Sequence, residues 1–396
     1  MDSIRRNIEV LIFRLRKVNY IQLVVMGIGI LLALYLRYLL RSFRSLDFIG
    51  NTGVWYARIR SQGFSALQDK FVQYTPPYPF LLYLVSITFP KVEDVAAVKI
   101  PAVAADFLCA WFVFRLVRLK YVKGLVPVVA FLAILFAPTI VINSSLWGQC
   151  DSPYTTALIA CIYFLITRRE KLTFVAFGIA LAFKLQAIFL APILLIFLLK
   201  KEISWKGLFF IPLIYLIAIL PAWLAGRPFV DLLRLFLTQV DWASSLSFDA
   251  PNLYAWLPGS SFNQFYFPGL ILSGVVCSIF IFLATKSRTE ITPSKTILLA
   301  LVSVVLMPFL LPKMHERYFY PADVMSIVFA FYYPDLFFVP ILIILCSLFA
   351  YLPFLFNLEI IPIPVLAFIL LITIGLIVQR MFVELDYTHH ASPDRT

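Results

Sequence analysis

The sequence predicts an all-α protein that crosses a membrane many times, and three observations support this prediction. Of its 396 residues, 62% are hydrophobic and only 14% are charged, whereas soluble domains are about half apolar and about a quarter charged. The mean hydropathy is +0.93. Long apolar runs recur along the chain, with the charges gathered in short clusters between them. Because a helix needs about 20 apolar residues to cross a bilayer, the chain has room for roughly a dozen spans.

We expect about twelve transmembrane helices in a single domain that comprises residues 1–396, without internal repeats or a soluble domain. They are expected at about 20–40, 95–117, 124–142, 152–167, 172–184, 187–199, 207–224, 266–284, 296–311, 319–333, 336–353 and 362–381. The two that flank Lys184 are short, so we expect them to be bent or to cross incompletely. The basic, amphipathic segment 1–17 is typical of a helix on the membrane surface. The run at 20–40 lacks a small-residue cleavage site and is interpreted as a first span, not a signal peptide.

The positions of the cations predict how the chain is oriented. Cytoplasmic loops carry an excess of Lys and Arg. With the N-terminus in the cytoplasm, most of the 33 Lys and Arg residues fall in inner segments. Counting the apolar segment 76–90 as a span would reverse this bias for the clusters at 115–123 and 168–171. We therefore expect 76–90 to form a helix packed within the first outer loop.

The same distribution explains the net charge of +12, so no nucleic-acid partner is expected. The five cysteines show no C-x-x-C spacing, which argues against a zinc site and a disulfide framework. Only three histidines occur, and His389 and His390 lie in the polar tail. A histidine-built metal site is therefore not expected, and neither is a cofactor.

Under this orientation the unusual polar sequences fall in the expected outer loops, at 41–94, 143–152, 184–186, 225–265 and 312–321. They are Asp47-Phe48 with Trp55, Tyr74-Thr75-Pro76-Pro77-Tyr78, Trp147-Gly148-Gln149 with Asp151, Phe183-Lys184-Leu185-Gln186, Ala250-Pro251-Asn252-Leu253 and Met314-His315-Glu316-Arg317-Tyr318. The inner loops show only short Lys/Arg clusters. This asymmetry favours a binding or active site that faces outward.

Each of these motifs also has a structural interpretation. Trp147 could anchor the chain at the membrane interface, and Lys184 could extend its amine to the lipid headgroups. The trio His315-Glu316-Arg317 could form a solvated turn. Asp106 lies inside the second expected span, where an acid costs about 2.5–3.5 kcal/mol at the centre. We therefore expect Asp106 to face a basic partner or a cavity and to have a structural role.

One outward-facing carboxylate beside several cations fits sugar transfer from a lipid-linked donor. Nucleotide sugars are absent outside the cytoplasm, and the leaving group of a polyprenyl-phosphate sugar is a phosphate monoester with a second pKa near about 6. Such a group leaves without a general acid if its charge is held. The minimal machinery is a carboxylate that takes the acceptor's hydroxyl proton, with Lys, Arg or His on the phosphate. No outer Asp-x-Asp metal motif occurs; the nearest sequence, Glu384-Leu385-Asp386, lies in the expected cytoplasmic tail.

In this order, the motifs resemble those of GT-C fold glycosyltransferases, specifically the prokaryotic family related to the second mannosyltransferase of GPI-anchor assembly. The resemblance covers residues 41–325. The dolichyl-phosphate-glucose glucosyltransferases of N-glycan assembly are more distantly similar and have a His-Glu-Lys trio. Arg317 stands at the third position here, which keeps the cation but alters its geometry.

The resemblance implies an inverting, metal-independent transferase of a hexose, most often mannose or glucose, built as a bundle of about 12 transmembrane helices with a helical first outer loop. Asp47 would be the catalytic base, and Lys184, His315 and Arg317 would bind the donor phosphate. The residues expected in the sugar or acceptor pocket are Trp147, Gln149, Asp151, Glu316, Tyr74 and Asn252. Asp94 and Asp151 are the alternative bases.

The expected partners are a polyprenyl-phosphate sugar donor, a lipid or glycan acceptor, and membrane lipids. The short loops and the lack of a retrieval tail favour a bacterial plasma membrane over the endoplasmic reticulum of a eukaryote. Two other functions stay open. A lipid-linked sugar flippase would need polar groups through both leaflets, and inverted repeats with broken helices would support it. A lipid-linked glycan ligase or polymerase would use a diphosphate-linked oligosaccharide.

Overall fold

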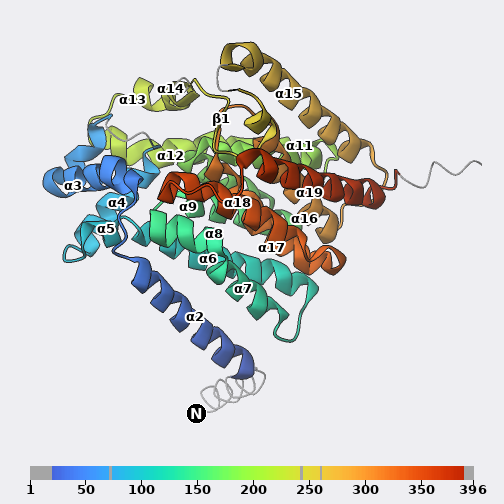
Figure 1. Cartoon of the computed structure of the whole chain (residues 1–396), viewed down its shortest axis with the longest axis horizontal. Helices are drawn as coiled ribbons and strands as arrows, with labels where there is room; N and C mark the ends of the chain where they lie inside the picture. The colour runs from blue at the N-terminus through green and yellow to red at the C-terminus, as the bar shows by residue number, and fades with distance from the viewer. Residues whose placement is uncertain (1–19, 71–73, 241–243, 259–260, 388–396) are drawn as a thin grey trace, which may run out of the picture.

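The computed structural model shows an all-α, multi-pass membrane protein (Figure 1). It describes residues 20–70, 74–240, 244–258 and 261–387, so the amphipathic helix expected at 1–17 lies outside the described residues. Within them, seven helices are long and apolar enough to cross a membrane. A further pair, Val126–Phe136 and Pro138–Trp147, bends by 47° at its junction and would make an eighth span.

The main helices are α2 (Tyr20–Leu40), α6 (Ile100–Lys120), α7 (Val126–Phe136), α8 (Pro138–Val141), α9 (Asp151–Ile166), α10 (Glu170–Phe183), α11 (Ala191–Leu199), α12 (Phe210–Leu224), α15 (Phe262–Lys286), α16 (Pro293–Leu310), α17 (Tyr320–Tyr332), α18 (Val339–Phe356) and α19 (Ile363–Glu384). Shorter helices are α3 (Gly53–Gln62), α4 (Pro77–Thr88), α5 (Asp94–Ala97), α13 (Phe229–Leu233) and α14 (Leu235–Val240). Short segments of 3₁₀- or π-helix are η1 (Phe48–Thr52), η2 (Gly63–Gln68), η3 (Ile142–Trp147), η4 (Leu185–Leu190), η5 (Trp205–Phe209), η6 (Leu253–Trp256), η8 (Glu316–Phe319) and η9 (Pro334–Leu336). Two short strands, β1 (Ser247–Phe248) and β2 (Met314–His315), pair in parallel.

Helical structure occupies each of the twelve positions expected from the apolar runs, but several of the helices are short. Helix α10 has 14 residues, which at 1.5 Å per residue reach about 21 Å, less than the roughly 30 Å of a hydrocarbon core. The chain breaks after α10, as expected, because Lys184 has extended backbone angles (φ −158°, ψ 134°) before η4 begins. The apolar runs therefore predicted where helices form better than how far each one reaches.

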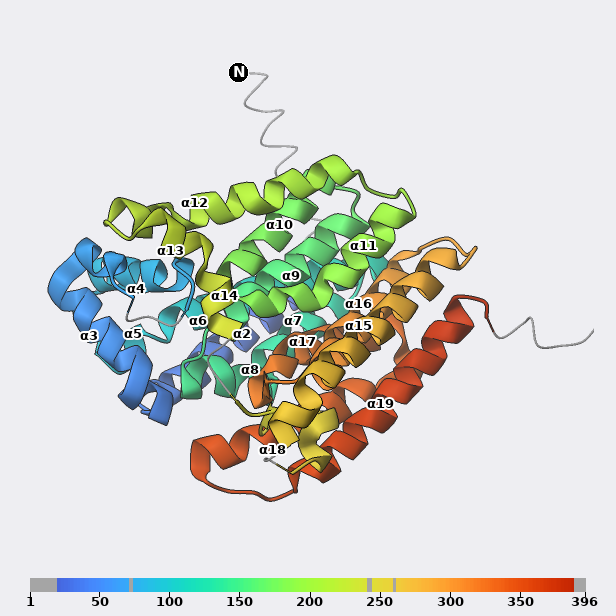
Figure 2. The same cartoon turned by 90° about the horizontal axis from the view of Figure 1, so that it is seen from above.

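The segment before α6 forms a small helical layer beside the bundle. Trp55 and Ile59 of α3 pack against Tyr78 and Leu82 of α4 in one buried cluster. Figure 2 shows these helices next to α12 and α13, and Lys70 pairs with Asp231 of α13 at 2.7 Å. The prediction that 76–90 forms a helix packed within this loop is confirmed.

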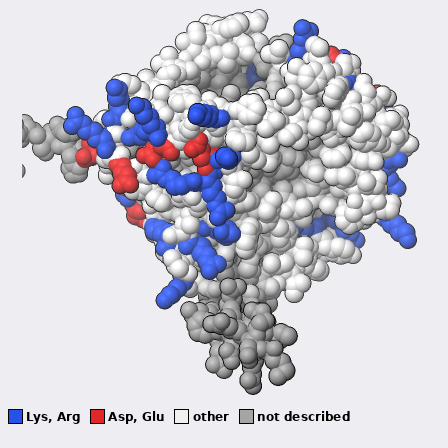
Figure 3. Space-filling view, turned by 180° about the vertical axis from the view of Figure 1, so that it is seen from behind, with Lys and Arg blue, Asp and Glu red and all other residues white. Residues whose placement is uncertain are grey.

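The basic loops of the bundle lie together at one end. Lys200, after α11, donates a hydrogen bond to the carbonyl of Ser287 (2.7 Å), and the Ser287 hydroxyl donates to the carbonyl of Leu385 (3.0 Å). Arg168, after α9, pairs with Glu202. Figure 3 shows the charged side chains gathered on the left and lower left of the surface, with most of the remaining face uncharged. Among the described residues, the basic segments that follow α9, α11 and α15 therefore lie at the same end of the molecule.

Asp106 has the basic partner that its position inside a helix requires. The side chain is fully buried, and its Oδ2 accepts hydrogen bonds from Arg37 Nη2 of α2 (2.9 Å) and from the Ser144 hydroxyl (2.6 Å). Arg37 is only 5% exposed. The ion pair joins α2, α6 and η3 where an unpaired charge would be costly, which agrees with the structural role expected for Asp106.

Candidate functional site

Two sets of hydrogen bonds, made by the side chains of Lys99 and Ser45, hold the chain between α2 and Asp47. The amine of Lys99, beside the start of α6, donates hydrogen bonds to the carbonyls of Leu40 (3.0 Å), Arg41 (3.1 Å) and Phe43 (2.8 Å). A cation satisfies the unpaired carbonyls at a helix C-terminus and complements its dipole. The buried Ser45 hydroxyl then donates to the carbonyl of Trp147 (2.9 Å) and accepts from the backbone N–H of Phe48 (3.1 Å). These contacts hold the turn that carries Asp47 against η3.

The carboxylate of Asp47 is held by neutral donors. Its Oδ2 accepts hydrogen bonds from Trp147 Nε1 (2.7 Å) and Gln149 Nε2 (2.6 Å), and its Oδ1 accepts one from Asn51 Nδ2 (3.3 Å). The hydroxyl of Tyr74 donates to Gln149 Oε1 (3.0 Å), which orients that amide. An ionised carboxylate has about four acceptor positions, so the three donors leave Asp47 room for one hydroxyl of a ligand.

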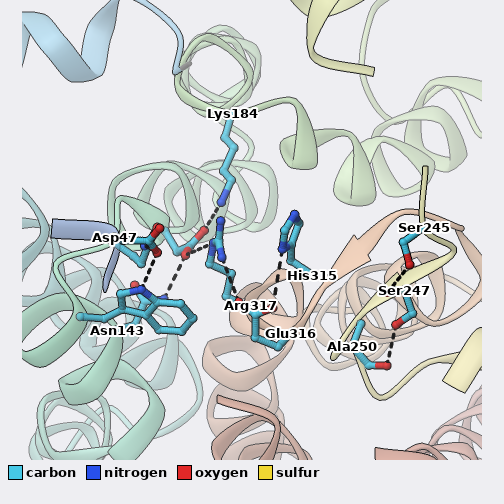
Figure 4. A network of polar contacts seen from close by, with 12 residues as sticks. Asp47, Asn143, Lys184, Ser245, Ser247, Ala250, His315, Glu316 and Arg317 are labelled. Carbon is cyan, nitrogen blue, oxygen red and sulfur yellow. Dashed lines mark hydrogen bonds and ion pairs between the residues drawn. The ribbon is translucent and has the colours of Figure 1, made fainter. Parts of the chain in front are cut away.

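The trio His315-Glu316-Arg317 approaches from the loop before α17. Strand pairing aligns Phe248 with His315, and their rings stack with centroids 4.5 Å apart. Glu316 lies between its neighbours: its Oε2 is 3.6 Å from His315 Nδ1, and its Oε1 accepts a hydrogen bond from Arg317 Nη1 (2.9 Å). In Figure 4, Arg317 and His315 lie between Asp47 on one side and the loop of Ser247 and Ala250 on the other.

Burial and charge together set the protonation of the trio. Burial lowers the pKa of His315, and Arg317 lowers it further against the opposing effect of Glu316. Burial alone would raise the pKa of Glu316, but Arg317 and His315 outweigh it and the pKa is lowered. Burial likewise opposes the charge on Arg317, yet Glu316 and the surrounding acids and phenols raise its pKa well above the ordinary value. At neutral pH, Arg317 is charged and His315 is neutral.

Asp47 and the trio line one cavity of about 430 Å³. Of the other pocket residues expected from the sequence, Tyr74 and Gln149 line it too. The rest of the wall is formed by Asn51, Thr52, Trp55, Ser247, Phe248, Asp249 and Phe354. The carboxylate before the second expected span and the cations before the tenth therefore share one chamber, as the sequence predicted.

Lys184, Asp151 and Trp147 lie behind the cavity wall. Lys184 is 6% exposed and forms an ion pair with Asp151, whose other oxygen accepts a hydrogen bond from Asn143 Nδ2 (2.9 Å) and lies 4.0 Å from Arg317 Nε. Trp147 is 1% exposed, and its ring centroid is 5.4 Å from the guanidinium carbon of Arg317. Lys184 therefore does not reach the cavity as a phosphate ligand in this conformation, because Asp151 holds its charge.

Three further residues that the sequence analysis expected at the site do not line the cavity. Asn252, expected in the pocket, is fully buried: its amide oxygen accepts from the backbone N–H of Tyr254 (3.1 Å), and its amide nitrogen donates to the carbonyl of Leu311 (3.4 Å). It caps η6, a position that Asn favours. Among the alternative bases, Asp94 pairs with Arg60 and does not line the cavity, and Asp151 is fully buried behind it.

The structure adds wall residues that the motifs did not single out. Asp249 has a left-handed φ of 52°, and burial, then Glu316 and Glu359, raise the pKa of its carboxyl. Its position beside Ala250-Pro251-Asn252 in a polar loop could have indicated that Asp249 lies at the site. Phe354 comes from the apolar run of α18, where nothing in the sequence distinguishes it from a lipid-facing residue.

The donor set of the cavity is one carboxylate held by neutral groups, one guanidinium and one imidazole, with Glu316 and Asp249 beside them. Among the described residues, no group of three or more His, Cys, Asp or Glu side chains could hold a metal ion. The arrangement can accept a proton at Asp47 and hold an anion at Arg317 and His315. No known protein family and no curated protein matches the chain.

Proposed function

We propose that the protein is an inverting hexosyltransferase. It transfers mannose or glucose from a polyprenyl-phosphate donor to a hydroxyl group of a lipid or glycan acceptor. One observation carries the proposal: Asp47, His315 and Arg317 line the same cavity although they lie far apart in the sequence. A base and an anion-binding group in one chamber are what this reaction requires.

Asp47 is the base in the proposed reaction. The acceptor hydroxyl donates a hydrogen bond to the acceptor position that the three protein donors leave open, and its oxygen attacks C1 of the sugar. The acceptor's proton goes to Asp47 as the new C1–O bond forms, and the bond from C1 to the phosphate oxygen breaks. Attack opposite the leaving group inverts C1.

Arg317 and His315 hold the leaving group. The donor phosphate is a diester with one negative charge, and it becomes a monoester with a growing second charge as the C1–O bond breaks. Arg317 offers a planar pair of N–H donors to phosphate oxygens. A neutral His315 donates one hydrogen bond and gains basicity as the phosphate charge develops. Both contacts strengthen toward the transition state, which is the requirement for catalysis.

The proposed architecture is the GT-C fold in twelve transmembrane passes, with a helical first loop on the outer face. The cavity is built beside the C-terminal end of α2 and the N-terminal end of α17, whereas the basic loops follow α9 and α11 at the other end. The positive-inside rule places the basic loops and the N-terminus in the cytoplasm. The cavity then faces the extracytoplasmic side of a plasma membrane, where lipid-linked donors are the available ones.

The test is sugar transfer by the purified protein in liposomes. The wild type is given labelled polyprenyl-phosphate mannose or glucose, with a membrane extract as acceptor. Asp47→Asn should reduce product about 100- to 10,000-fold, the usual contribution of a general base. Asp94→Asn is the matched control, since Asp94 belongs to the same loop but lies off the cavity.

Retained transfer by Asp47→Asn would remove Asp47 from the mechanism. Movement of the labelled lipid between leaflets without product would favour a flippase. Use of a diphosphate-linked oligosaccharide, but of no monophosphate donor, would favour a ligase or polymerase.

A further inference from the structure

A second concentration of charge lies at the opposite ends of α9 and α10 from the cavity. The turn after α9 and the turn after α11 are joined by the ion pair of Arg168 with Glu202, and by a hydrogen bond from the backbone N–H of Ser204 to Glu170 Oε1 (3.0 Å). Their cations are Arg168, Arg169, Lys171, Lys200, Lys201 and Lys206. Both turns pass through left-handed backbone angles, at Arg168 and at Lys201 (φ 59° each). We call these two joined turns the basic double turn.

The cations of the basic double turn outnumber the two acids of these turns, Glu170 and Glu202. Glu202 is paired with Arg168, and Glu170 accepts the contact from Ser204. In the described part of the chain, no carboxylate pairs with Arg169 or Lys171, and both side chains are exposed. These two cations, with Glu170 and Leu172, line a shallow hollow of about 350 Å³. An anion of phosphate size that enters the hollow meets two cations that pair with no described carboxylate, on either side of Glu170.

Exposed apolar side chains surround the same turns. Leu172 is 41% exposed, Leu199 45%, Trp205 53% and Phe209 67%. They lie at or beside the ends of apolar helices. In a membrane, the ends of spanning helices lie where headgroups meet hydrocarbon, and tryptophan is enriched at that level. A soluble anion would match only the cations, whereas a phospholipid with an anionic headgroup matches both the cations and the apolar rim.

We propose that the basic double turn binds the headgroup of an anionic phospholipid. Arg169 and Lys171 contact the lipid phosphate, and the acyl chains lie along Leu172 and Trp205. A bias of cations toward one face accounts for charge at this end in general. It does not account for two turns that Glu170 and Glu202 join, beside two cations that pair with no carboxylate among the described residues. The proposal is independent of the sugar-transfer reaction.

The experiment measures lipid retained by the full-length protein. Wild type is purified in detergent, mixed with equal amounts of phosphatidylglycerol and phosphatidylcholine, and the bound lipids are counted by native mass spectrometry. Phosphatidylglycerol should be retained preferentially. Arg169→Gln/Lys171→Gln should weaken that preference at least about tenfold, because each cation near an anionic surface contributes about 1 kcal/mol.

The matched control is Arg118→Gln/Lys123→Gln, which removes two exposed cations beside the α6–α7 turn, at the end of α6 that contacts the end of α9 through Arg115 and Tyr163. It should leave the preference unchanged. Equal loss in both variants, or no preference in the wild type, would overturn the proposal and leave only a general effect of charge.

A second measurement locates the lipid. Brominated phosphatidylglycerol should quench tryptophan fluorescence more strongly than brominated phosphatidylcholine. The difference in quenching between the two lipids should become smaller in Trp205→Phe. It should become smaller by the same amount in Arg169→Gln/Lys171→Gln. An unchanged difference in both variants would place the lipid elsewhere and contradict the proposed site.

Discussion

Two acids of the molecule, Asp47 and Asp106, receive similar numbers of hydrogen bonds but differ in the charge of their partners. Asp106 is fully buried and is bound by Arg37, Ser144 and, at 3.3 Å, the hydroxyl of Tyr320. Among the described residues, Asp47 accepts only from the neutral groups of Trp147, Gln149 and Asn51, and it lines a cavity. A permanent cation suits an acid that joins helices, whereas neutral donors orient a carboxylate and leave its charge available to a ligand.

The two regions are connected through one short segment. Ser144, in η3, binds Asp106, and the last residue of η3, Trp147, binds Asp47. The Arg37–Asp106 pair therefore supports the wall of the cavity without lining it. Substitutions in the two regions should separate stability from catalysis.

The largest expected effect is on stability, at the buried pair. Asp106→Asn leaves the charge of Arg37 buried without its counter-ion, which should destabilise the fold by about 3–5 kcal/mol. Thermal unfolding of the purified protein in detergent measures the loss. The double replacement Arg37→Met/Asp106→Leu should recover much of it, because no unpaired charge remains. A single variant as stable as the wild type would show that the pair does not join the helices as described.

Next in size is the effect of removing the cavity cation. Arg317→Ala should reduce sugar transfer about 100-fold, the scale seen when one group that stabilises developing charge is lost. Arg317→Lys should recover only part of it, because a lysine keeps the charge but not the paired donors. Initial rates with saturating acceptor and varied donor give the result. Full activity of Arg317→Ala would mean that the trio does not bind the leaving group.

A smaller effect is expected at Ser45, which positions the base without touching a ligand. Ser45→Ala loses the contacts to Trp147 and Phe48, so Asp47 is positioned less well. If this raises the activation free energy by about 1 kcal/mol, kcat falls roughly fivefold. The KM for the donor should stay nearly the same, because the contacts of Ser45 are to Trp147 and Phe48 and not to Arg317. Ser45→Thr keeps the hydroxyl and should restore the rate. A change in KM with constant kcat would contradict the positioning role.

The smallest expected effect is a pH dependence from His315. Its pKa is lowered in the folded protein by burial and by Arg317, so the unfolded chain binds a proton more readily than the folded one. The stability that this contributes is fully present above the unfolded value of about 6.5, and it is lost as the pH falls from there through the lower folded pKa. The melting temperature of the wild type should therefore drop more than that of His315→Gln between pH 7.5 and 5.5. Equal drops would remove His315 as the source.

The sequence predicted the helices well because the apolar runs, the Lys/Arg clusters and the polar loops are all local signals. It also predicted that Asp47 and His315 meet, since the orientation put both on one face. It could not place Lys184 or Asn252. Whether Lys184 contacts a ligand depends on Asp151, its buried partner, and Asn252 is used by its own loop as a cap. These contacts depend on tertiary packing, which the local sequence does not reveal.

The shared, outward-facing chamber can be tested directly by thiol labelling. Asn51→Cys and Ser247→Cys, made separately in a cysteine-free chain, place a thiol on two different loops of the cavity wall. Ser204→Cys places one at the basic end as a control. In intact cells a membrane-impermeant maleimide should label the first two, polyprenyl-phosphate mannose should protect both, and Ser204→Cys should react only after permeabilisation. Labelling of positions 51 and 247 from opposite sides of the membrane, or from the same side as 204, would contradict the account.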